Sequence, residues 1–223
     1  MKLPAKLRLL VLVSVTAFSC TTHPEQPPFW KEIEAFKMKD HQQLPPKQSI
    51  LFVGSSSFTK WTDIQNYFPG FPIINRGFGG SSLPDVVRYA SDIIYPYMPR
   101  QIVMYCGEND LASSDTITPE IVLQRFQQLF DSIRIHQNNV PFVFISIKPS
   151  PSRWRLEPLF LKTNQLIIEF LQKKPQTIYV NVHNAMLLPD GRVNPEIFLA
   201  DSLHMNAKGY AIWQKILLPV LIQ

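Results

Sequence analysis

The serines near residue 55 are the first side chains in this sequence that could do covalent chemistry. Residues 49–53 are rich in β-branched and aromatic types and are followed by Gly54, a pattern typical of a short buried strand that ends in a sharp turn. Ser55, Ser56 and Ser57 come next. A serine at the carboxyl end of a strand in an open parallel sheet is well placed to act as a nucleophile. The alternative is that these hydroxyls only cap a turn or a helix.

A histidine preceded by a carboxylate could supply the base for such a nucleophile. Asp201 lies three residues before His204, close enough to accept the Nδ1 proton and leave Nε2 basic. No histidine or acidic residue shows metal-ligand spacing such as His-Glu-x-x-His, and we expect neither a metal nor another cofactor. Four further histidines lack such a carboxylate and are expected to be surface or structural residues: His23, His41, His136 and His183.

Two more loops are expected at the same edge of the sheet. Residues 75–82 contain several glycines, which let backbone N–H groups approach a ligand closely. Residues 107–110 contain Asn109, whose side-chain amide can donate a hydrogen bond to a ligand or simply stabilise the turn. The glycines also suggest a dinucleotide site, but the Gly-x-Gly-x-x-Gly spacing and the acidic residue that binds a ribose are missing. A nucleotide is therefore not expected.

A proline-rich loop at residues 148–154 follows another apolar run. It places a cation and an indole near the expected site, so Arg153 and Trp154 are candidate substrate-binding residues. Loop structure alone would also explain their presence, and the sequence leaves both interpretations open.

The segments between and before these loops alternate between strand-like and helix-like patterns of apolar residues. Runs of strand type alternate with longer segments of helical spacing, which predicts right-handed βαβ units and a parallel sheet covered on both faces. The expected fold is a three-layer α/β/α sandwich with a five-stranded parallel sheet. The strands are expected at residues 49–53, 72–75, 101–106, 142–147 and 177–182. The helices are expected at residues 29–40, 83–94, 119–136, 156–173 and 207–221.

The N-terminal segment resembles an export signal. Residues 1–19 carry cationic residues and then an apolar run, and the apolar part is too short for a mature membrane span. We expect residues 1–19 to be removed, residues 20–28 to form a tether and residues 29–223 to form the folded domain. Residues 17–20 resemble a lipobox, which predicts lipidation of Cys20 and a membrane-anchored protein of the bacterial periplasm or cell envelope. Conventional cleavage near this point is the alternative.

The net charge and the cysteines indicate which binding partners and which cysteine chemistry to expect. The 223-residue chain has a formal charge of +5, and three positive charges lie in residues 1–19, which leaves +2 on the remainder. Without a basic stripe interleaved with aromatic residues, nucleic acid is not an expected partner. Cys106 ends an apolar run and is expected to be a buried free thiol. The oligomeric state is left open.

Four separated blocks resemble the SGNH (GDSL-like) hydrolases, in the order found in that family. They are residues 54–56, 77–80, 107–110 and 201–204, and they extend over nearly the whole expected domain. The arrangement is similar to the branch that contains platelet-activating-factor acetylhydrolase-like proteins and carbohydrate O-acetylesterases. The resemblance implies a flavodoxin-like sheet, with Ser56 as nucleophile, His204 as base, Asp201 as its support, and Ser56, Gly80 and Asn109 as the oxyanion hole.

Two positions depart from the family pattern. Ser55 stands where the family has aspartate, and Glu108 replaces the usual threonine before the asparagine. The resemblance implies a serine esterase, with acetyl esters of carbohydrates as the expected substrates. A lysophospholipase or thioesterase for longer acyl chains is one alternative, and a non-catalytic glycan-binding lipoprotein is another.

Overall fold

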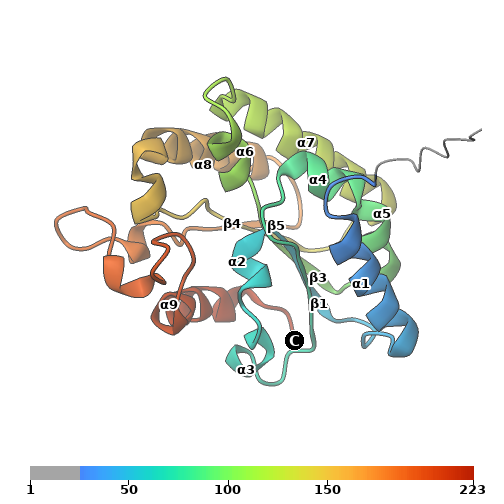
Figure 1. The fold of residues 1–223 in the computed structure, drawn as a ribbon. Coiled ribbons are helices and arrows are strands. Elements are labelled where there is room, and N and C mark those ends of the chain that lie inside the picture. Colours follow the sequence, from blue (N-terminus) through green and yellow to red (C-terminus); the bar gives the residue numbers. More distant parts are fainter. Residues whose placement is uncertain (1–25) are drawn as a thin grey trace, which may run out of the picture.

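The middle layer of the molecule is a sheet of five parallel strands in the order β2-β1-β3-β4-β5 (Figure 1). The computed structural model describes residues 26–223. The strands are β1 (Ile50–Gly54), β2 (Ile73–Gly77), β3 (Gln101–Tyr105), β4 (Phe142–Ile145) and β5 (Thr177–Val180). In the register of the sheet, Gly54 pairs with both Gly77 and Tyr105, so β1, β2 and β3 end level with one another. The expected α/β fold with a five-stranded parallel sheet is confirmed.

Helices cover both faces of the sheet, as alternate strand residues require. In β1, Leu51 and Val53 pack toward one face, whereas Ile50 and Phe52 pack toward the other. The first face is covered by α1 (Trp30–Gln42), α4 (Leu83–Arg88), α5 (Ala90–Ile93), α7 (Pro119–His136) and α8 (Glu157–Leu171). The second is covered by α2 (Ser56–Thr59), α3 (Ile64–Tyr67) and α9 (Ala207–Leu217). The short helix α6 (Glu108–Ser113) follows β3 directly.

Some boundaries differ from the sequence-based expectation for local reasons. The helix expected at residues 83–94 is broken at Tyr89, whose backbone leaves the helical region between α4 and α5. The strand expected to reach residue 147 ends at Ile145, because the side-chain amide of Asn164 bonds both the N–H and the carbonyl of Ile147. The helix expected to reach residue 221 ends at Leu217 and continues as a 3₁₀ turn.

The N-terminal end of the described chain lies against the loop that follows β2. The Phe29 ring packs edge-on against Phe78, with ring centroids 5.3 Å apart, and Tyr89 donates a hydrogen bond to the carbonyl of Pro28 at 2.6 Å. Phe29 also lies beside Gly80, since a Cβ on that glycine would be 3.9 Å from the Phe29 Cε1 atom. The first residues that the structure describes are thereby held against the glycine-rich loop.

The remaining sequence-based expectations for the N-terminal region concern residues that the structure does not describe. Residues 1–19, Cys20 and most of the tether at 20–28 lie outside residues 26–223. Within the described range, no helix is both long enough and apolar enough to cross a membrane. Cys106 is buried as a free thiol, as expected, and burial raises the pKa of that thiol well above its ordinary value.

Candidate active site

The loops that carry the candidate residues meet where the sheet order changes direction. From β1 the chain passes to β2 on one side and then returns to β3 on the other, so the carboxyl ends of β1 and β3 form a switch point, the usual ligand position in open α/β sheets. Gly54 ends β1 with φ of 144°, and a Cβ there would lie 1.9 Å from the Tyr105 carbonyl oxygen. Only glycine fits this position, and the next residue, Ser55, donates its N–H to that same oxygen at 3.1 Å.

Exposure distinguishes the three consecutive serines. Ser55 and Ser57 are buried, with 3% and 2% of their surface exposed, whereas Ser56 is partly exposed at the first position of α2. The Ser56 N–H makes no hydrogen bond to any group within residues 26–223. Ser56 is therefore the one serine of this turn whose hydroxyl a ligand can reach, and its free N–H can donate to the same ligand.

The expected histidine and aspartate pair is formed. His204 Nδ1 lies 2.6 Å from Asp201 Oδ2, and Asp201 Oδ1 accepts the backbone N–H groups of Leu203 and His204 at 3.0 and 2.9 Å. These bonds close a tight turn in which Ser202 has φ of 56°. The His204 side chain, followed by its backbone N–H, holds the pKa of Asp201 well below its usual range. An aspartate that is ionised and doubly held in this way fixes the ring and leaves Nε2 to take a proton.

The base and the exposed serine lie on elements that pack together. Tyr210, in the first turn of α9, donates from its hydroxyl to the Ser57 carbonyl at 2.8 Å, which fastens α9 to α2. Within residues 26–223, no hydrogen bond joins Ser56 Oγ to His204. Catalytic hydrogen bonds are often long in ligand-free enzymes and shorten only when substrate binds.

The glycine-rich loop and the asparagine also lie side by side. Ser81 donates from its hydroxyl to the Gly54 carbonyl at 3.2 Å, and its own carbonyl accepts from Asn109 Nδ2 at 2.9 Å. Gly80 has φ of 86°, and its N–H has no hydrogen-bond partner in the described part of the chain. The second Nδ2 hydrogen of Asn109 has no acceptor among residues 26–223. The loop therefore offers donors beside the end of β1, as an oxyanion hole requires.

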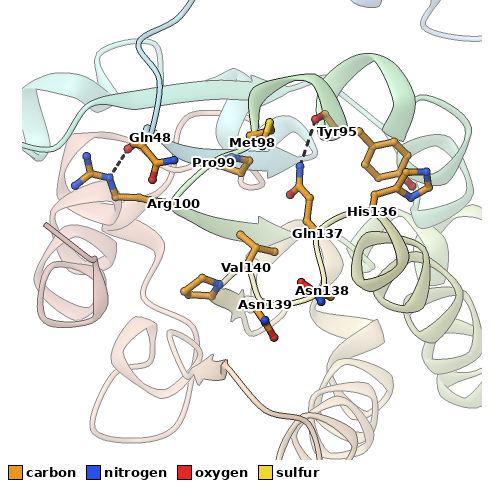
Figure 2. A pocket seen from close by; sticks show the side chains of 11 residues that line it. Gln48, Tyr95, Met98, Pro99, Arg100, His136, Gln137, Asn138, Asn139 and Val140 are labelled. Carbon is orange, nitrogen blue, oxygen red and sulfur yellow. Dashed lines mark hydrogen bonds between the residues drawn. The ribbon is translucent and has the colours of Figure 1, made fainter.

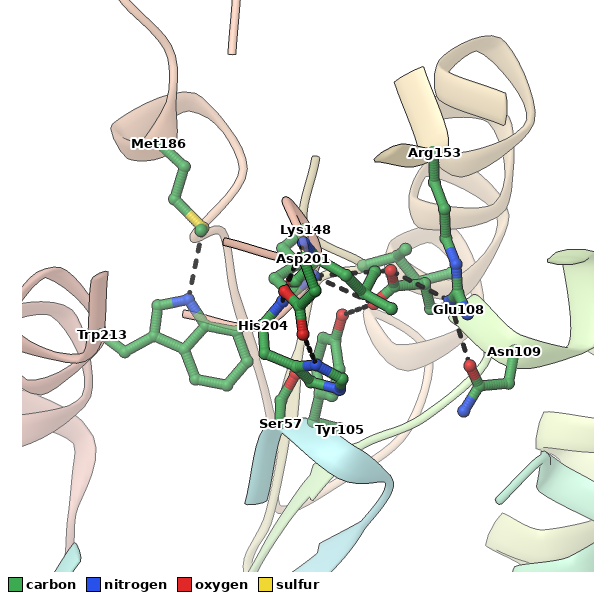
Figure 3. A network of polar contacts seen from close by, with 12 residues as sticks. Ser57, Tyr105, Glu108, Asn109, Lys148, Arg153, Met186, Asp201, His204 and Trp213 are labelled. Carbon is green, nitrogen blue, oxygen red and sulfur yellow. Dashed lines mark hydrogen bonds and ion pairs between the residues drawn. The ribbon is translucent and has the colours of Figure 1, made fainter. Parts of the chain in front are cut away.

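A buried ionic cluster, which was not predicted from the sequence, connects Asn109 with the turn before His204 (Figure 3). The Glu108 carboxylate is 3.3 Å from Lys148 Nζ and 3.1 Å from the Arg153 guanidinium, and it accepts from the Tyr105 hydroxyl. Lys148 is buried and does not face the mouth of the site as a free cation. The sequence signal was a pair of opposite charges just after two adjacent strands, at the ends of β3 and β4, but Tyr105 gave no signal.

Burial and the neighbouring charges shift the pKa values of the groups in this cluster. Burial alone would raise the pKa of Glu108, but the charges of Lys148 and Arg153, with the Tyr105 hydrogen bond, outweigh burial and lower it. Burial also lowers the pKa of Lys148, against the opposing attraction of Glu108. The pKa of Tyr105 is raised by burial and by the adjacent carboxylate. Glu108 is therefore the ionised centre of the cluster.

Comparison with known proteins finds solved structures of similar fold. No protein-family model and no curated protein sequence matches the chain. A GDSL-like lipase from Bacteroides thetaiotaomicron matches with a TM-score of 0.70 and 16% identity over 84% of this chain and 96% of that one. A Bacteroides fragilis protein described as an acylhydrolase matches with a TM-score of 0.75 and 15% identity over 88% and 97%. An acetylxylan esterase from Geobacillus stearothermophilus matches with a TM-score of 0.61 and 12% identity over 77% and 93%.

The chain has the GDSL-like (SGNH) hydrolase fold. In this SGNH fold, the two residues expected to bind substrate have separate positions. Trp154, 40% exposed, lines a cavity of about 420 Å³ together with the apolar side chains of Leu188 and Val193. Arg153 instead points to Asn109 and donates to its Oδ1 at 3.0 Å. The cavity adjoins the histidine turn, because Ser152 donates its N–H to the Ser202 carbonyl at 3.0 Å.

A larger cavity lies at the opposite edge of the SGNH sheet (Figure 2). It has a volume of about 660 Å³, and Gln48, Arg100 and Val140, which line it, come just before β1, β3 and β4. His136 in its wall stacks on Tyr95 at 3.8 Å and bonds the Ser132 carbonyl, so that its contacts are structural. None of the described residues that line this cavity carries a carboxylate. The candidate chemistry therefore belongs to the smaller site at the carboxyl edge.

Within residues 26–223, no group of three or more histidine, cysteine, aspartate or glutamate side chains is placed to hold a metal ion. His183, expected to be structural, is buried and bonds Glu157 and Asn184. The candidate site thus consists of a serine, a histidine with its carboxylate, and hydrogen-bond donors, all at one edge of the sheet.

Proposed function

We propose that this protein is a serine ester hydrolase that works through an acyl-enzyme on Ser56. The observation that carries the proposal is that Ser56 alone among three serines is accessible, at the same sheet edge as a His204 ring fixed by Asp201. Solved structures of similar fold support it, since they include a lipase, an acylhydrolase and an acetylxylan esterase. Catalytic mutants of that acetylxylan esterase replace a serine and a histidine.

Each residue has a definite task in this reaction. His204 Nε2 takes the hydroxyl proton as Ser56 Oγ attacks the ester carbonyl, and Asp201 stabilises the imidazolium that forms. The N–H groups of Ser56 and Gly80 and the amide of Asn109 donate to the oxyanion of the tetrahedral intermediate. The imidazolium then protonates the leaving alcohol. Water activated by the same base hydrolyses the acyl-enzyme and restores the serine.

The favoured substrates are acetyl esters of carbohydrates. Support comes from the acetylxylan esterase of similar fold and from Trp154, because an exposed indole face packs well against a sugar ring. We further propose that the protein is exported and anchored through a lipid on Cys20, which the lipobox-like residues 17–20 support. Such a location gives the enzyme access to polymeric substrates outside the cytoplasm.

A second candidate function is hydrolysis of esters or thioesters with longer acyl chains. The cavity beside Trp154 favours it, since Leu188, Val193 and two prolines make its wall largely apolar. A cavity of about 420 Å³ could hold an acyl chain of several carbons instead of a sugar. The two functions differ in what this cavity binds, and both use the same serine.

The test combines an ester series with labelling of the nucleophile. Purified protein is assayed on p-nitrophenyl esters from acetyl to long acyl chains, beside Ser56→Ala and His204→Ala. We expect a preference for acetyl, which both substitutions abolish, and labelling of Ser56 by a serine-reactive phosphonate. Preference for long chains would favour the second function. Labelling of Ser55 or Ser57 would refute the assignment of the nucleophile, and an inert protein that binds glycans would make it a binding lipoprotein.

A further inference from the structure

The Glu108 cluster touches both halves of the candidate site. We propose that Glu108, through Arg153 and Lys148, is a positioning group that orients the Asn109 amide and holds the turn before His204. This inference rests on the proposed function and goes beyond it, because none of these three residues is needed for the chemical steps given above. The cluster would explain why this chain has a glutamate directly before the asparagine and a lysine three residues after the end of β4.

The first arm of the cluster runs through Arg153 to the oxyanion side. The same guanidinium nitrogen of Arg153 donates to Asn109 Oδ1 at 3.0 Å and lies 3.1 Å from Glu108 Oε1. A guanidinium has donors and no acceptor, so it can bond only the oxygen end of the amide. Nδ2 must then face the other way, where it bonds the Ser81 carbonyl beside Gly80. Arg153 and the Ser81 carbonyl therefore together select the amide orientation in which Asn109 is a donor to the site.

The second arm runs through Lys148 to the base. Lys148 Nζ donates to the Leu203 carbonyl at 3.0 Å and lies within 3.3 Å of Glu108 Oε2. Leu203 lies within the turn that Asp201 and His204 close. Asp201 is 48% exposed on its side chain, whereas Lys148 is 1% exposed. The turn is thus held from the interior by Lys148, where water does not compete for the bond.

The carboxylate is what allows both cations to stay in place. Arg153 and Lys148 carry two positive charges into a region that is largely shielded from solvent, with side-chain exposures of 21% and 1%. Without Glu108 they would repel each other in a medium of low polarity. Tyr105 completes the site with a hydrogen bond to the carboxylate, and Asp201 adds a further negative charge near Lys148. The Glu108 carboxylate therefore holds two cations in place, of which Arg153 contacts Asn109 and Lys148 contacts the turn before His204.

Arg153→Ala is the first test, because Arg153 is partly exposed and its removal spares the core. We expect kcat on p-nitrophenyl acetate to fall about 10- to 100-fold with KM changed less than about threefold, since the amide stays but loses the charged one of the two bonds that orient it. Added guanidinium should restore part of kcat. Arg155→Ala is the matched control, since Arg155 lies two residues away, is 69% exposed and, among residues 26–223, forms an ion pair with Asp115 alone. It should behave as wild type and gain nothing from guanidinium.

Glu108→Gln and the double variant with Arg153→Ala test whether the arms share one centre. We expect Glu108→Gln to lower kcat at least as much as Arg153→Ala, and the double variant to be about as active as Glu108→Gln. If the kcat losses of the two single variants multiply in the double variant, Glu108 and Arg153 act independently and the shared role of Glu108 is refuted. If the urea unfolding curve shows that Glu108→Gln does not fold, kcat and KM of Arg153→Ala and its Arg155→Ala control test the positioning role on their own.

The outcomes separate this inference from the proposed function. Wild-type protein that is inert on every ester and unlabelled by phosphonate refutes the serine hydrolase. Active wild type, inactive Ser56→Ala and an Arg153→Ala variant with unchanged kcat refute the positioning role alone. A rise in KM with unchanged kcat would likewise refute it and make Arg153 a substrate-binding residue.

Discussion

Replacing Asp201 by asparagine should harm activity more than replacing it by alanine. In the native turn, Asp201 Oδ1 accepts two backbone N–H groups, from Leu203 and His204, and Oδ2 faces His204 Nδ1. The two N–H donors require an oxygen at the first position, so an asparagine must place its NH₂ against the ring. Nδ1 then becomes an acceptor and the ring proton moves to Nε2, which can no longer act as a base. Alanine imposes no such choice.

The expected magnitudes follow from the exposure of this side chain. Asp201 is 48% exposed, so in Asp201→Ala water can occupy the vacated space and bond Nδ1, and we expect kcat/KM to fall about 10- to 100-fold. In Asp201→Asn the wrong tautomer is held by protein groups, and we expect a loss of roughly 10⁴-fold, as found for the equivalent change in serine proteases. Both variants should stay folded, since the pair is near the surface.

Initial rates on p-nitrophenyl acetate at neutral pH measure both losses, and urea unfolding curves verify the fold. Asp115→Asn is the matched control because its side chain is 92% exposed and far from the histidine turn in sequence. The ¹⁵N chemical shifts of the His204 ring report directly which nitrogen carries the proton. Equal activities of the two variants, or an asparagine variant with the proton on Nδ1, would refute the argument.

Two further predictions concern stability and use urea unfolding. Gly54→Ala should not give a folded protein, because the added Cβ would lie 1.9 Å from the Tyr105 carbonyl oxygen at a φ of 144°. Gly191→Ala, with a φ of 82° and no atom within 4 Å of the added Cβ, should lower the free energy of unfolding by only about 1–2 kcal/mol. Similar losses of stability in both variants would contradict this prediction. Burial alone would lower the pKa of His183, but its bonds to Glu157 and Asn184 raise it, so the free energy of unfolding should decrease as pH rises from about 6 to 8. Glu157→Gln should flatten that slope, and a wild-type stability that increases over this range would show the sign to be wrong.

Much of the sheet could be predicted because its strands are short and largely apolar, and β1, β3 and β4 are buried along their whole length. Periodicity also located the long helices, and Pro119–His136 agrees with the predicted range because Thr118 and Pro119 mark its start. The helices α2, α3 and α6 have only four to six residues, too few for a helical period to be visible. The break between α4 and α5 falls at Tyr89, where no glycine or proline marks it in the sequence.

The site could be predicted in part for a similar reason. Asp201 and His204 are close in sequence, so their contact follows from local spacing, and resemblance to a family supplied Ser56, Gly80 and Asn109. The partners of Glu108 could not be predicted, because Lys148 and Arg153 come from a loop about 40 residues away and meet it only when β3 and β4 pair. The distinction between Ser56 and its buried neighbours likewise depends on tertiary packing.

The packing of Phe29 beside Gly80 also bears on which side of the protein would face a membrane to which it is anchored. The described part of the chain begins next to the glycine-rich loop, so a tether before it would start from the side of the molecule that holds the candidate site. A tether of residues 20–28 can extend at most about 30 Å. With a lipid on Cys20, as proposed, the catalytic edge would operate within a short radius of the bilayer. Esters displayed on the envelope itself would then be encountered at a high local concentration, whereas freely diffusing ones would gain nothing from the anchor.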